Sequence, residues 1–255
     1  MAQGLFDLAG RRVLITGSGR GIGFALARGL AEAGASIVLN GRDAAALANA
    51  AATLRAEGFD IAEAVFDVTD SHGLDAAVAE VEARCGPIEV LVNNAGINRR
   101  AIATEVTVQA FRDVQAVNVE AVFFMAQACA RRMLQRGHGK IINIASVQSE
   151  LGRPTITPYS TSKGAVRTMT RSLCAEWAKA GLQVNAIAPG YFATDLTRPL
   201  QEDPVFSDWL CRRVPAGRWG RVEELVGAAI FLASRGSDFV NGHLLFVDGG
   251  MTAVV

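Results

Sequence analysis

The sequence predicts an α/β protein built on a doubly wound parallel sheet of about seven strands, with helices on both faces. Two observations predict this class. Short runs rich in β-branched apolar residues alternate along the chain with Ala-rich segments of helical periodicity. Polar and glycine-rich motifs directly follow the apolar runs, and the carboxyl ends of parallel strands would gather such motifs at one edge of the sheet.

Seven apolar runs have the composition of buried parallel strands. They cover residues 12–17, 36–41, 62–68, 88–96, 140–146, 183–190 and 243–250. Helical periodicity covers residues 21–34, 43–58, 71–86, 107–137, about 158–180 and 222–236. No linker, repeat or low-complexity segment interrupts this order, so residues 1–255 are expected to form a single domain. The exception to the regular order is a Pro-interrupted insertion at 191–220, which we expect to form a substrate lid.

The composition excludes several classes of protein. Acidic and basic side chains balance at 25 each, which favours neither nucleic acid nor an acidic membrane surface as a partner. No segment has the features of a signal peptide or of a membrane-spanning helix. The four cysteines are scattered without a CxxC motif, which favours a reducing, cytoplasmic location. No His, Cys and carboxylate pattern indicates a metal site.

A glycine-rich turn, TGSGRGIG at residues 16–23, follows the first strand. Its glycines allow a tight turn and a close approach of backbone to a ligand, and the start of the next helix favours a pyrophosphate. The turn therefore predicts dinucleotide binding by a Rossmann fold, although its spacing is GxxxGxG and not GxGxxG. The alternative is a turn that serves only for packing. The predicted cofactor-binding residues here are Gly17, Ser18, Arg20, Gly21, Ile22 and Gly23.

The end of the second strand indicates which dinucleotide binds. NAD-binding folds usually place an acid here, on the ribose 2′-hydroxyl, but this chain has Gly41 followed by Arg42. A guanidinium fits a 2′-phosphate that a carboxylate would repel. The sequence therefore favours NADP(H), with NAD(H) as the alternative. A solvated loop arginine is the other interpretation of Arg42.

An acid–base pair is predicted at residues 159–163, YSTSK. The chain has only two tyrosines and three lysines, yet Tyr159 precedes Lys163 by four residues. On a helix this spacing places both side chains on one face, one turn apart. A phenol beside an ammonium is suited to proton transfer.

The ordered set of motifs resembles the short-chain dehydrogenase/reductase family over essentially the full length. The motifs are TGSGRGIG, FDV at 66–68, NNAG at 93–96, Asn118, Ser146, Tyr159 with Lys163, and PGYFAT at 189–194. The resemblance implies that Tyr159 is the general acid in carbonyl reduction and the base in alcohol oxidation. Lys163 and the positive nicotinamide ring would together lower the pKa of the phenol. Lys163 would also bind the nicotinamide ribose, and Ser146 would hold the substrate oxygen.

The same resemblance implies further roles. Asn118 would carry a water of a proton relay, Asp67 would meet the adenine, and Thr194 would bind the carboxamide of the cofactor. Two alternatives stay open, since Asn118 could merely bridge backbones and Asp67 could be a turn former. The remaining cofactor-binding residues implied are Val68, Asn94, Ala95, Gly96, Pro189 and Gly190.

The predicted substrate site is polar. Arg99 and Arg100 follow the fourth strand, and the loop after the fifth strand carries Gln148, Glu150 and Arg153. An arginine pairs well with a carboxylate, and an amide can hold hydroxyl groups, so a hydroxylated acid is favoured over a fatty-acyl or steroid substrate. Arginines that face water are the other interpretation.

Several further stretches, including GINRR, DPVFSDWL and PAGRWG, resemble the gluconate 5-dehydrogenase subgroup. This resemblance implies interconversion of D-gluconate and 5-keto-D-gluconate. The alternatives are a reductase of another sugar acid, polyol or 3-oxoacyl substrate, or a non-catalytic cofactor-binding regulator. The predicted substrate-binding residues are Arg100, Ser146, Gln148, Tyr159 and Tyr191.

Two long helices, at about 107–135 and 158–180, carry more apolar surface than one face of a sheet covers. The family buries such helices between subunits. A homotetramer is therefore expected, with the C-terminal MTAVV near an interface.

Overall fold

The computed structural model describes residues 2–194 and 197–255. Its centre is one seven-stranded parallel sheet in the order β3-β2-β1-β4-β5-β6-β7. The strands are β1 Arg12–Ile15, β2 Ser36–Gly41, β3 Ile61–Val65, β4 Val90–Asn93, β5 Gly139–Ile144, β6 Leu182–Pro189 and β7 Leu244–Val247. Each falls within or overlaps a predicted strand, so the predicted doubly wound α/β class is confirmed.

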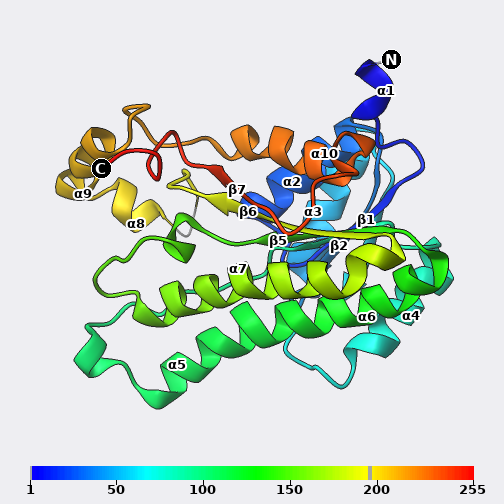
Figure 1. The fold of residues 1–255 in the computed structure, drawn as a ribbon, viewed down its shortest axis with the longest axis horizontal. Coiled ribbons are helices and arrows are strands. Elements are labelled where there is room, and N and C mark those ends of the chain that lie inside the picture. The colour runs from blue at the N-terminus through cyan, green and yellow to red at the C-terminus, as the bar shows by residue number, and fades with distance from the viewer. Residues whose placement is uncertain (1, 195–196) are drawn as a thin grey trace.

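Helices cover both faces of this sheet (Figure 1). Alternate residues of a strand point to opposite faces, so Val13 and Ile15 belong to one core while Leu14 belongs to the other. The first core packs under α2 Gly21–Glu32, α3 Ala44–Ala56 and α10 Val226–Ala233. The second lies under α4 Leu74–Cys85, α6 Ala121–Arg136 and α7 Thr157–Trp177. Both faces are buried, as the continuous apolar runs predict.

The helix predicted over residues 107–137 is divided in the structure. It consists of α5 Val108–Gln115, a π-helical segment η2 Ala116–Glu120, and α6. Such segments occur frequently at functional sites, and this one contains the fully buried Asn118. The sequence pattern missed the division because periodicity does not reveal which side chains bond outside the helix.

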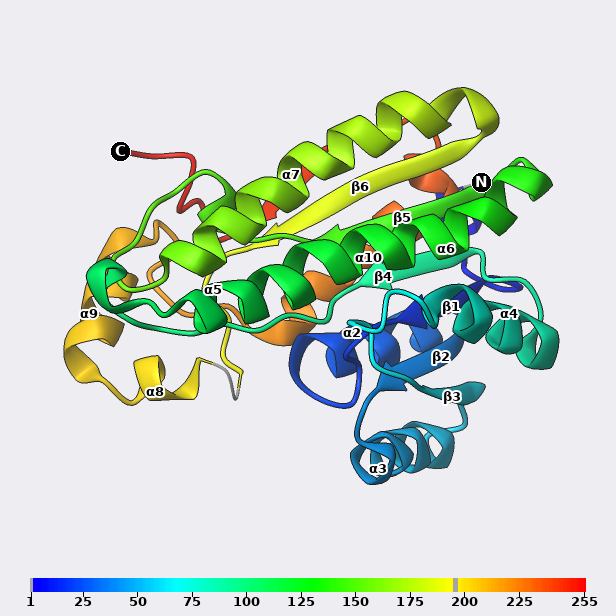
Figure 2. The same cartoon turned by 90° about the horizontal axis from the view of Figure 1, so that it is seen from below.

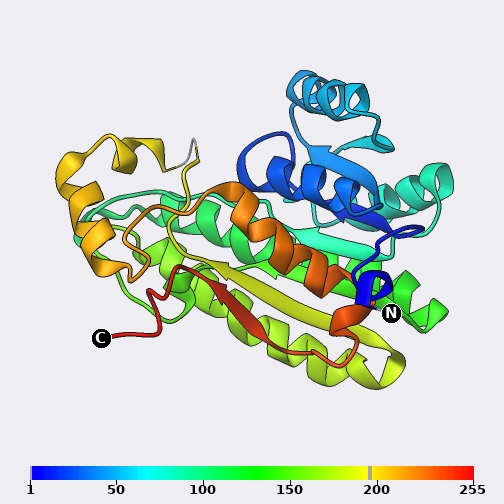
Figure 3. The ribbon, with the colours of Figure 1, turned by 90° about the horizontal axis from the view of Figure 1, so that it is seen from above.

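The segment after β6 carries two helices, α8 Arg198–Gln201 and α9 Pro204–Arg213. Asp203 caps α9 by accepting hydrogen bonds from the N–H groups of Val205 and Phe206, and Pro204 occupies the first turn. Figures 2 and 3 show both helices beyond the arrowhead of β6, far from the N-terminus. The predicted lid segment, apart from residues 195 and 196 that lie outside the described residues, is therefore located at the carboxyl edge of the sheet.

The remaining described elements are short. They are α1 Ala2–Leu5, η1 Ala103–Glu105, η3 Val147–Ser149, η4 Ala178–Ala180, η5 Val222–Leu225 and η6 Arg235–Ser237. Within residues 2–194 and 197–255, no helix combines the length and the apolar character that a membrane crossing requires.

Candidate active site

The fold brings Ser146, Tyr159 and Lys163 together at the carboxyl edge of the sheet. Ser146 follows β5, and the other two lie one turn apart on α7, as their spacing predicts. The Lys163 Nζ lies 5.6 Å from the centre of the Tyr159 ring. Ser146 Oγ accepts a hydrogen bond from the N–H of Gln148 at 3.1 Å, which fixes its orientation.

Lys163 is buried, with 4% of its surface exposed. Its Nζ donates to the carbonyl oxygen of Ile144 at 2.6 Å, at the end of β5. Burial lowers the pKa of Lys163 to about 8. An ammonium has three donors, so this bond leaves further donors for a ligand.

Two opposing effects act on the pKa of Tyr159. Burial raises the pKa of the phenol and is the larger effect. The hydrogen bond with Ser146 lowers the pKa by a smaller amount. The predicted lowering, which Lys163 and the bound nicotinamide ring would supply together, stays a prediction.

Asn118 joins three elements. Its Oδ1 accepts from the N–H of Ile97 at 2.9 Å, and its Nδ2 donates to the carbonyl of Ile97 at 2.9 Å and to Ser162 Oγ at 3.0 Å. Ser162 in turn donates to the carbonyl of Tyr159 at 2.6 Å. The alternative that Asn118 bridges backbones is thus observed, and the relay water stays a prediction. Sequence reasoning missed Ser162, which lies inside the YSTSK motif.

The glycine turn has the geometry that a dinucleotide site requires. Gly21 has φ +58°, a conformation that favours glycine, with open space where a side chain would be. A Cβ on Gly23 would lie 2.6 Å from the carbonyl oxygen of Gly17, so only glycine packs α2 this closely against β1. The exposed Arg20 precedes α2, and Ile22 packs against the first core. Backbone at a helix start, with space above it, fits a pyrophosphate.

Three predicted cofactor residues have polar groups that face into the fold. Ser18 is fully buried, and its Oγ donates to the carbonyl of Ile15 at 2.8 Å. Asn94 Nδ2 donates to the carbonyls of Thr16 and Gly17, at 2.9 and 3.0 Å. The N–H of Ala95 donates to Thr16 Oγ1 at 3.0 Å. These groups hold the glycine turn in shape. The sequence did not single out Thr16, whose position inside TGSGRGIG was the available signal.

Arg42 lies beside Asp67. Its Nη1 is 3.4 Å from Asp67 Oδ2, and both side chains are partly exposed. Burial raises the pKa of Asp67, but hydrogen bonds from Thr69 and the charge of Arg42 outweigh burial and hold the pKa below its usual value. The interpretation of Asp67 as a turn former is observed, since it accepts from the N–H of Thr69 at 2.9 Å, and its contact with the adenine stays a prediction. The neighbouring Val68 is a core residue.

The remaining predicted cofactor residues surround the same edge. A Cβ on Gly96 would lie 3.8 Å from Lys163 Nζ, and a Cβ on Gly190 would lie 2.8 Å from Asp248 Cα. Pro189 ends β6. The Oγ1 of Thr194 forms a hydrogen bond of 3.0 Å with Thr197 Oγ1, so this hydroxyl is engaged within its own segment.

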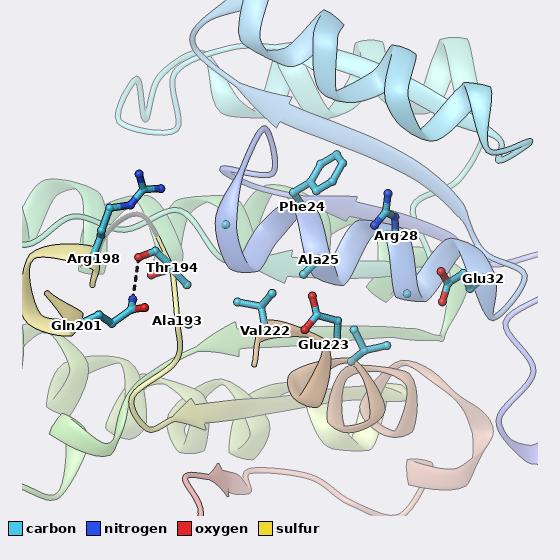
Figure 4. Close-up of a pocket in the computed structure, with 13 residues that line it drawn as sticks. Phe24, Ala25, Arg28, Glu32, Ala193, Thr194, Arg198, Gln201, Val222 and Glu223 are labelled. Atoms are coloured by element: carbon cyan, nitrogen blue, oxygen red, sulfur yellow. Dashed lines mark hydrogen bonds between the residues drawn. The ribbon is translucent and has the colours of Figure 1, made fainter. Parts of the chain in front are cut away.

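A cavity of about 560 Å³ runs along α2 from Gly21 to Glu32, between this helix, α8 and η5 (Figure 4). Gly21, Thr194 and Gln201 are among its lining residues, whereas Ser146, Tyr159 and Lys163 are not. The cavity therefore adjoins the predicted pyrophosphate site and is separate from the catalytic groups.

The predicted substrate residues lie on three loops. Tyr191 OH accepts a hydrogen bond from Arg153 Nη1 at 3.2 Å. Burial and the nearby charge of Arg153 lower the pKa of Arg100. Gln148 is buried, and its Oε1 has no hydrogen-bond partner among the described residues. Asn98 Oδ1 is likewise buried and has no hydrogen-bond partner among the described residues. The sequence analysis did not single out Asn98. Unpaired buried oxygens suit donors of a polyhydroxylated ligand.

The described residues contain no cluster of side chains that could bind a metal ion. Outside residues 1, 195 and 196, no group of three or more His, Cys, Asp or Glu side chains could hold a metal ion.

This chain is similar to known proteins along nearly its whole length. A family model described as enoyl-(acyl carrier protein) reductase matches residues 17–252. Gluconate 5-dehydrogenase of Gluconobacter oxydans is 56% identical over 248 residues, which cover 97% of each chain. The 5-keto-D-gluconate 5-reductase of Escherichia coli is 56% identical over 251 residues, which cover 98% of this chain and 99% of that protein.

A solved structure is similar along the entire chain. The gluconate 5-dehydrogenase of Burkholderia cenocepacia, in complex with NADP and tartrate, is 59% identical with a TM-score of 0.98 and covers 100% of both chains. Further relatives act on other substrates by name. Galactitol 2-dehydrogenase of Cereibacter sphaeroides is 44% identical over 251 residues, which cover 97% of each chain.

Proposed function

Because this chain belongs to the short-chain dehydrogenase/reductase family, we propose that it is an NADP(H)-dependent oxidoreductase that interconverts D-gluconate and 5-keto-D-gluconate. The observation that carries the proposal is the 56% identity to a gluconate 5-dehydrogenase and a 5-keto-D-gluconate 5-reductase over nearly the full length. The residues at the carboxyl edge of the sheet supply the chemistry that this reaction requires.

The proposed reaction reduces a ketone to a secondary alcohol. When bound, the nicotinamide supplies a hydride to the carbonyl carbon. Tyr159 donates its phenolic proton to the carbonyl oxygen, and Ser146, oriented by the N–H of Gln148, donates a hydrogen bond to the same oxygen. In the oxidation direction Tyr159 accepts the proton of the alcohol.

Lys163 has two roles in this proposal. Its ammonium lies close to the Tyr159 ring and favours the phenolate that forms after proton donation. Its remaining donors would hold the nicotinamide ribose, which also needs the space that Gly96 leaves open. Asn118 would hold the loop at Ile97 against the first turns of α7 through its bonds to Ile97 and Ser162. A water carried by Asn118 would connect Lys163 to solvent.

The cofactor would lie along the glycine turn, with its pyrophosphate at the start of α2. Arg42 and Arg20 would bind a 2′-phosphate, which supports NADP(H) over NAD(H). Arg42 would have to exchange Asp67 for the phosphate, and a partly exposed ion pair of this kind contributes little energy. The other proposed cofactor residues are Gly17, Ser18, Gly21, Ile22, Gly23, Asp67, Val68, Asn94, Ala95, Pro189, Gly190 and Thr194.

Arg100, Gln148 and Tyr191 would complete the substrate side of the site. The buried Gln148 Oε1 would accept from a substrate hydroxyl, and Arg100 would polarise or position the ketone. Residues 191–220 would serve as the lid of a single dinucleotide-binding domain. We further propose a cytoplasmic homotetramer. Free cysteines support the location, and exposed apolar residues of α5 such as Val108 support association.

The test is oxidation of NADPH, followed at 340 nm, with 5-keto-D-gluconate as substrate. We expect turnover that a Tyr159→Phe variant reduces at least about 100-fold while NADPH binding stays within about twofold. A panel of other sugar acids, galactitol and an acetoacetyl thioester runs in parallel. Turnover of a panel member in place of 5-keto-D-gluconate would reject the substrate, and cofactor binding without any turnover would favour a regulator.

A further inference from the structure

Arg153 is held in place at the substrate side of the site. Its Nη1 donates to the Tyr191 hydroxyl at 3.2 Å, and its guanidinium carbon lies 5.0 Å from the centre of the Phe206 ring. Phe206 belongs to α9 and packs against Tyr191 with 5.6 Å between ring centres. A guanidinium fixed in this way loses little further freedom when it binds a ligand.

No carboxylate of the described residues pairs with Arg153. The acid in the same loop, Glu150, pairs instead with Arg167 of α7 at 2.6 Å. Arg100 adds a second positive charge close enough for the charge of Arg153 to lower its pKa. Arg100 has no carboxylate partner either in the part of the chain that the structure describes. Two guanidinium groups that repel each other are stabilised when an anion binds to both.

The backbone also joins the loops that carry these two arginines. The N–H of Ala101 donates to the carbonyl of Thr155 at 3.0 Å. Thr155 has φ +69°, a left-handed conformation that β-branched residues rarely adopt. Such strain persists where the surrounding structure enforces it, and it gathers at binding sites. This hydrogen bond joins the two loops one residue from Arg100 and two residues from Arg153.

We infer that Arg153, positioned by Tyr191 and Phe206, binds the carboxylate of the substrate together with Arg100 and makes the enzyme select sugar acids over neutral ketoses. This inference rests on the proposed function. It assigns the selectivity to a residue outside the Ser146, Tyr159 and Lys163 group, so a change at Arg153 affects binding of the acid and leaves proton transfer intact.

The experiment compares two substrates in an Arg153→Gln variant. L-sorbose differs from 5-keto-D-gluconate in having a hydroxymethyl group in place of the carboxylate. We expect KM for the acid to rise about 10- to 100-fold, as the loss of charge-assisted hydrogen bonds predicts. The kcat for the acid and kcat/KM for L-sorbose should change less than about threefold. The control is Arg212→Gln, an exposed arginine of α9 whose replacement should leave both substrates unaffected.

An equal loss of kcat/KM on both substrates would give Arg153 a structural role only and overturn the inference, as would unchanged kinetics. Absence of turnover of 5-keto-D-gluconate by the unmodified enzyme would reject the proposed function instead. In that case calorimetric titration of D-gluconate and D-glucitol into the NADP⁺ complex decides. The inference expects binding of D-gluconate that Arg153→Gln weakens at least about tenfold. No binding, or binding that the variant leaves unaltered, overturns it.

Discussion

The Nζ of Lys163 lies 2.6 Å from the carbonyl oxygen of Ile144, so α7 places a buried ammonium on the last residue of β5. That contact satisfies one donor of a group that burial strongly disfavours in its charged form. The same position lies beside Tyr159, where the charge serves the proposed proton transfer. Stability and function therefore impose opposite demands on Lys163.

Replacing Lys163 by methionine should stabilise the fold and abolish turnover. Burial lowers the pKa of Lys163 to about 8 from 10.5, so below pH 8 the folded protein must hold an ammonium in a buried site. We expect Lys163→Met to raise the free energy of unfolding by about 2 kcal/mol at pH 7, after the lost hydrogen bond to Ile144 is counted. Urea unfolding measures this difference.

The pH dependence of that difference has a defined direction. The unfolded chain keeps its proton up to about pH 10.5, whereas the folded protein releases it near pH 8. The advantage of Lys163→Met is therefore complete below pH 8 and shrinks as the pH rises toward 10.5. The exposed Lys179 gives the control, since Lys179→Met should leave stability unchanged throughout. A less stable Lys163→Met protein at pH 7 would contradict this account.

Arg42→Gln should reduce the preference for NADPH over NADH. The guanidinium would make charge-assisted hydrogen bonds to the 2′-phosphate, which NADH lacks. We expect KM for NADPH to rise about 10- to 100-fold, while KM for NADH changes less than about threefold. Steady-state kinetics with both cofactors measure the change. Arg235→Gln, in η6, is the control, and an equal effect on both cofactors would refute the role of Arg42.

Asn118→Ala should destabilise the fold by about 3 kcal/mol. The substitution leaves the N–H and the carbonyl of Ile97 without their partner at 2.9 Å, and each unsatisfied buried group costs about 1–3 kcal/mol. Urea denaturation gives the value. Gln109→Ala removes an exposed hydrogen bond to Asp113 on α5 and should cost under about 0.5 kcal/mol. A similar small loss for Asn118→Ala would mean that water replaces its bonds.

The local features of the fold follow from the sequence because they depend on residues close together in the chain. Alternation of apolar runs and helical periods predicted all seven strands and the helices that cover the sheet, but not α8 and α9 in the segment after β6. The spacing of Tyr159 and Lys163 predicted that they share one face of a helix. The glycines at 17, 21 and 23 predicted a tight turn before α2, which the φ of +58° at Gly21 bears out.

Other features depend on residues that only the folded chain brings together. Arg42 meets Asp67 because β2 and β3 are neighbours in the sheet. The end of β2 has no carboxylate of its own at Gly41, but β3 brings the carboxylate of Asp67 to it. The bonds of Asn118 to Ile97 cross 21 residues, and they accompany a π-helical segment that periodicity cannot reveal.

The sequence by itself determined the fold class, the order of its elements and the residue types at the catalytic edge, because hydrophobic periodicity and turn chemistry act locally. The tertiary structure decided the pKa shifts of the ionisable side chains and the partners with which they pair. Burial raises the pKa of Tyr159 although an ammonium lies one turn away, and Glu150 pairs with Arg167 of α7 and not with Arg153 of its own loop. Burial and pairing depend on the three-dimensional surroundings of each group, which sequence spacing does not contain.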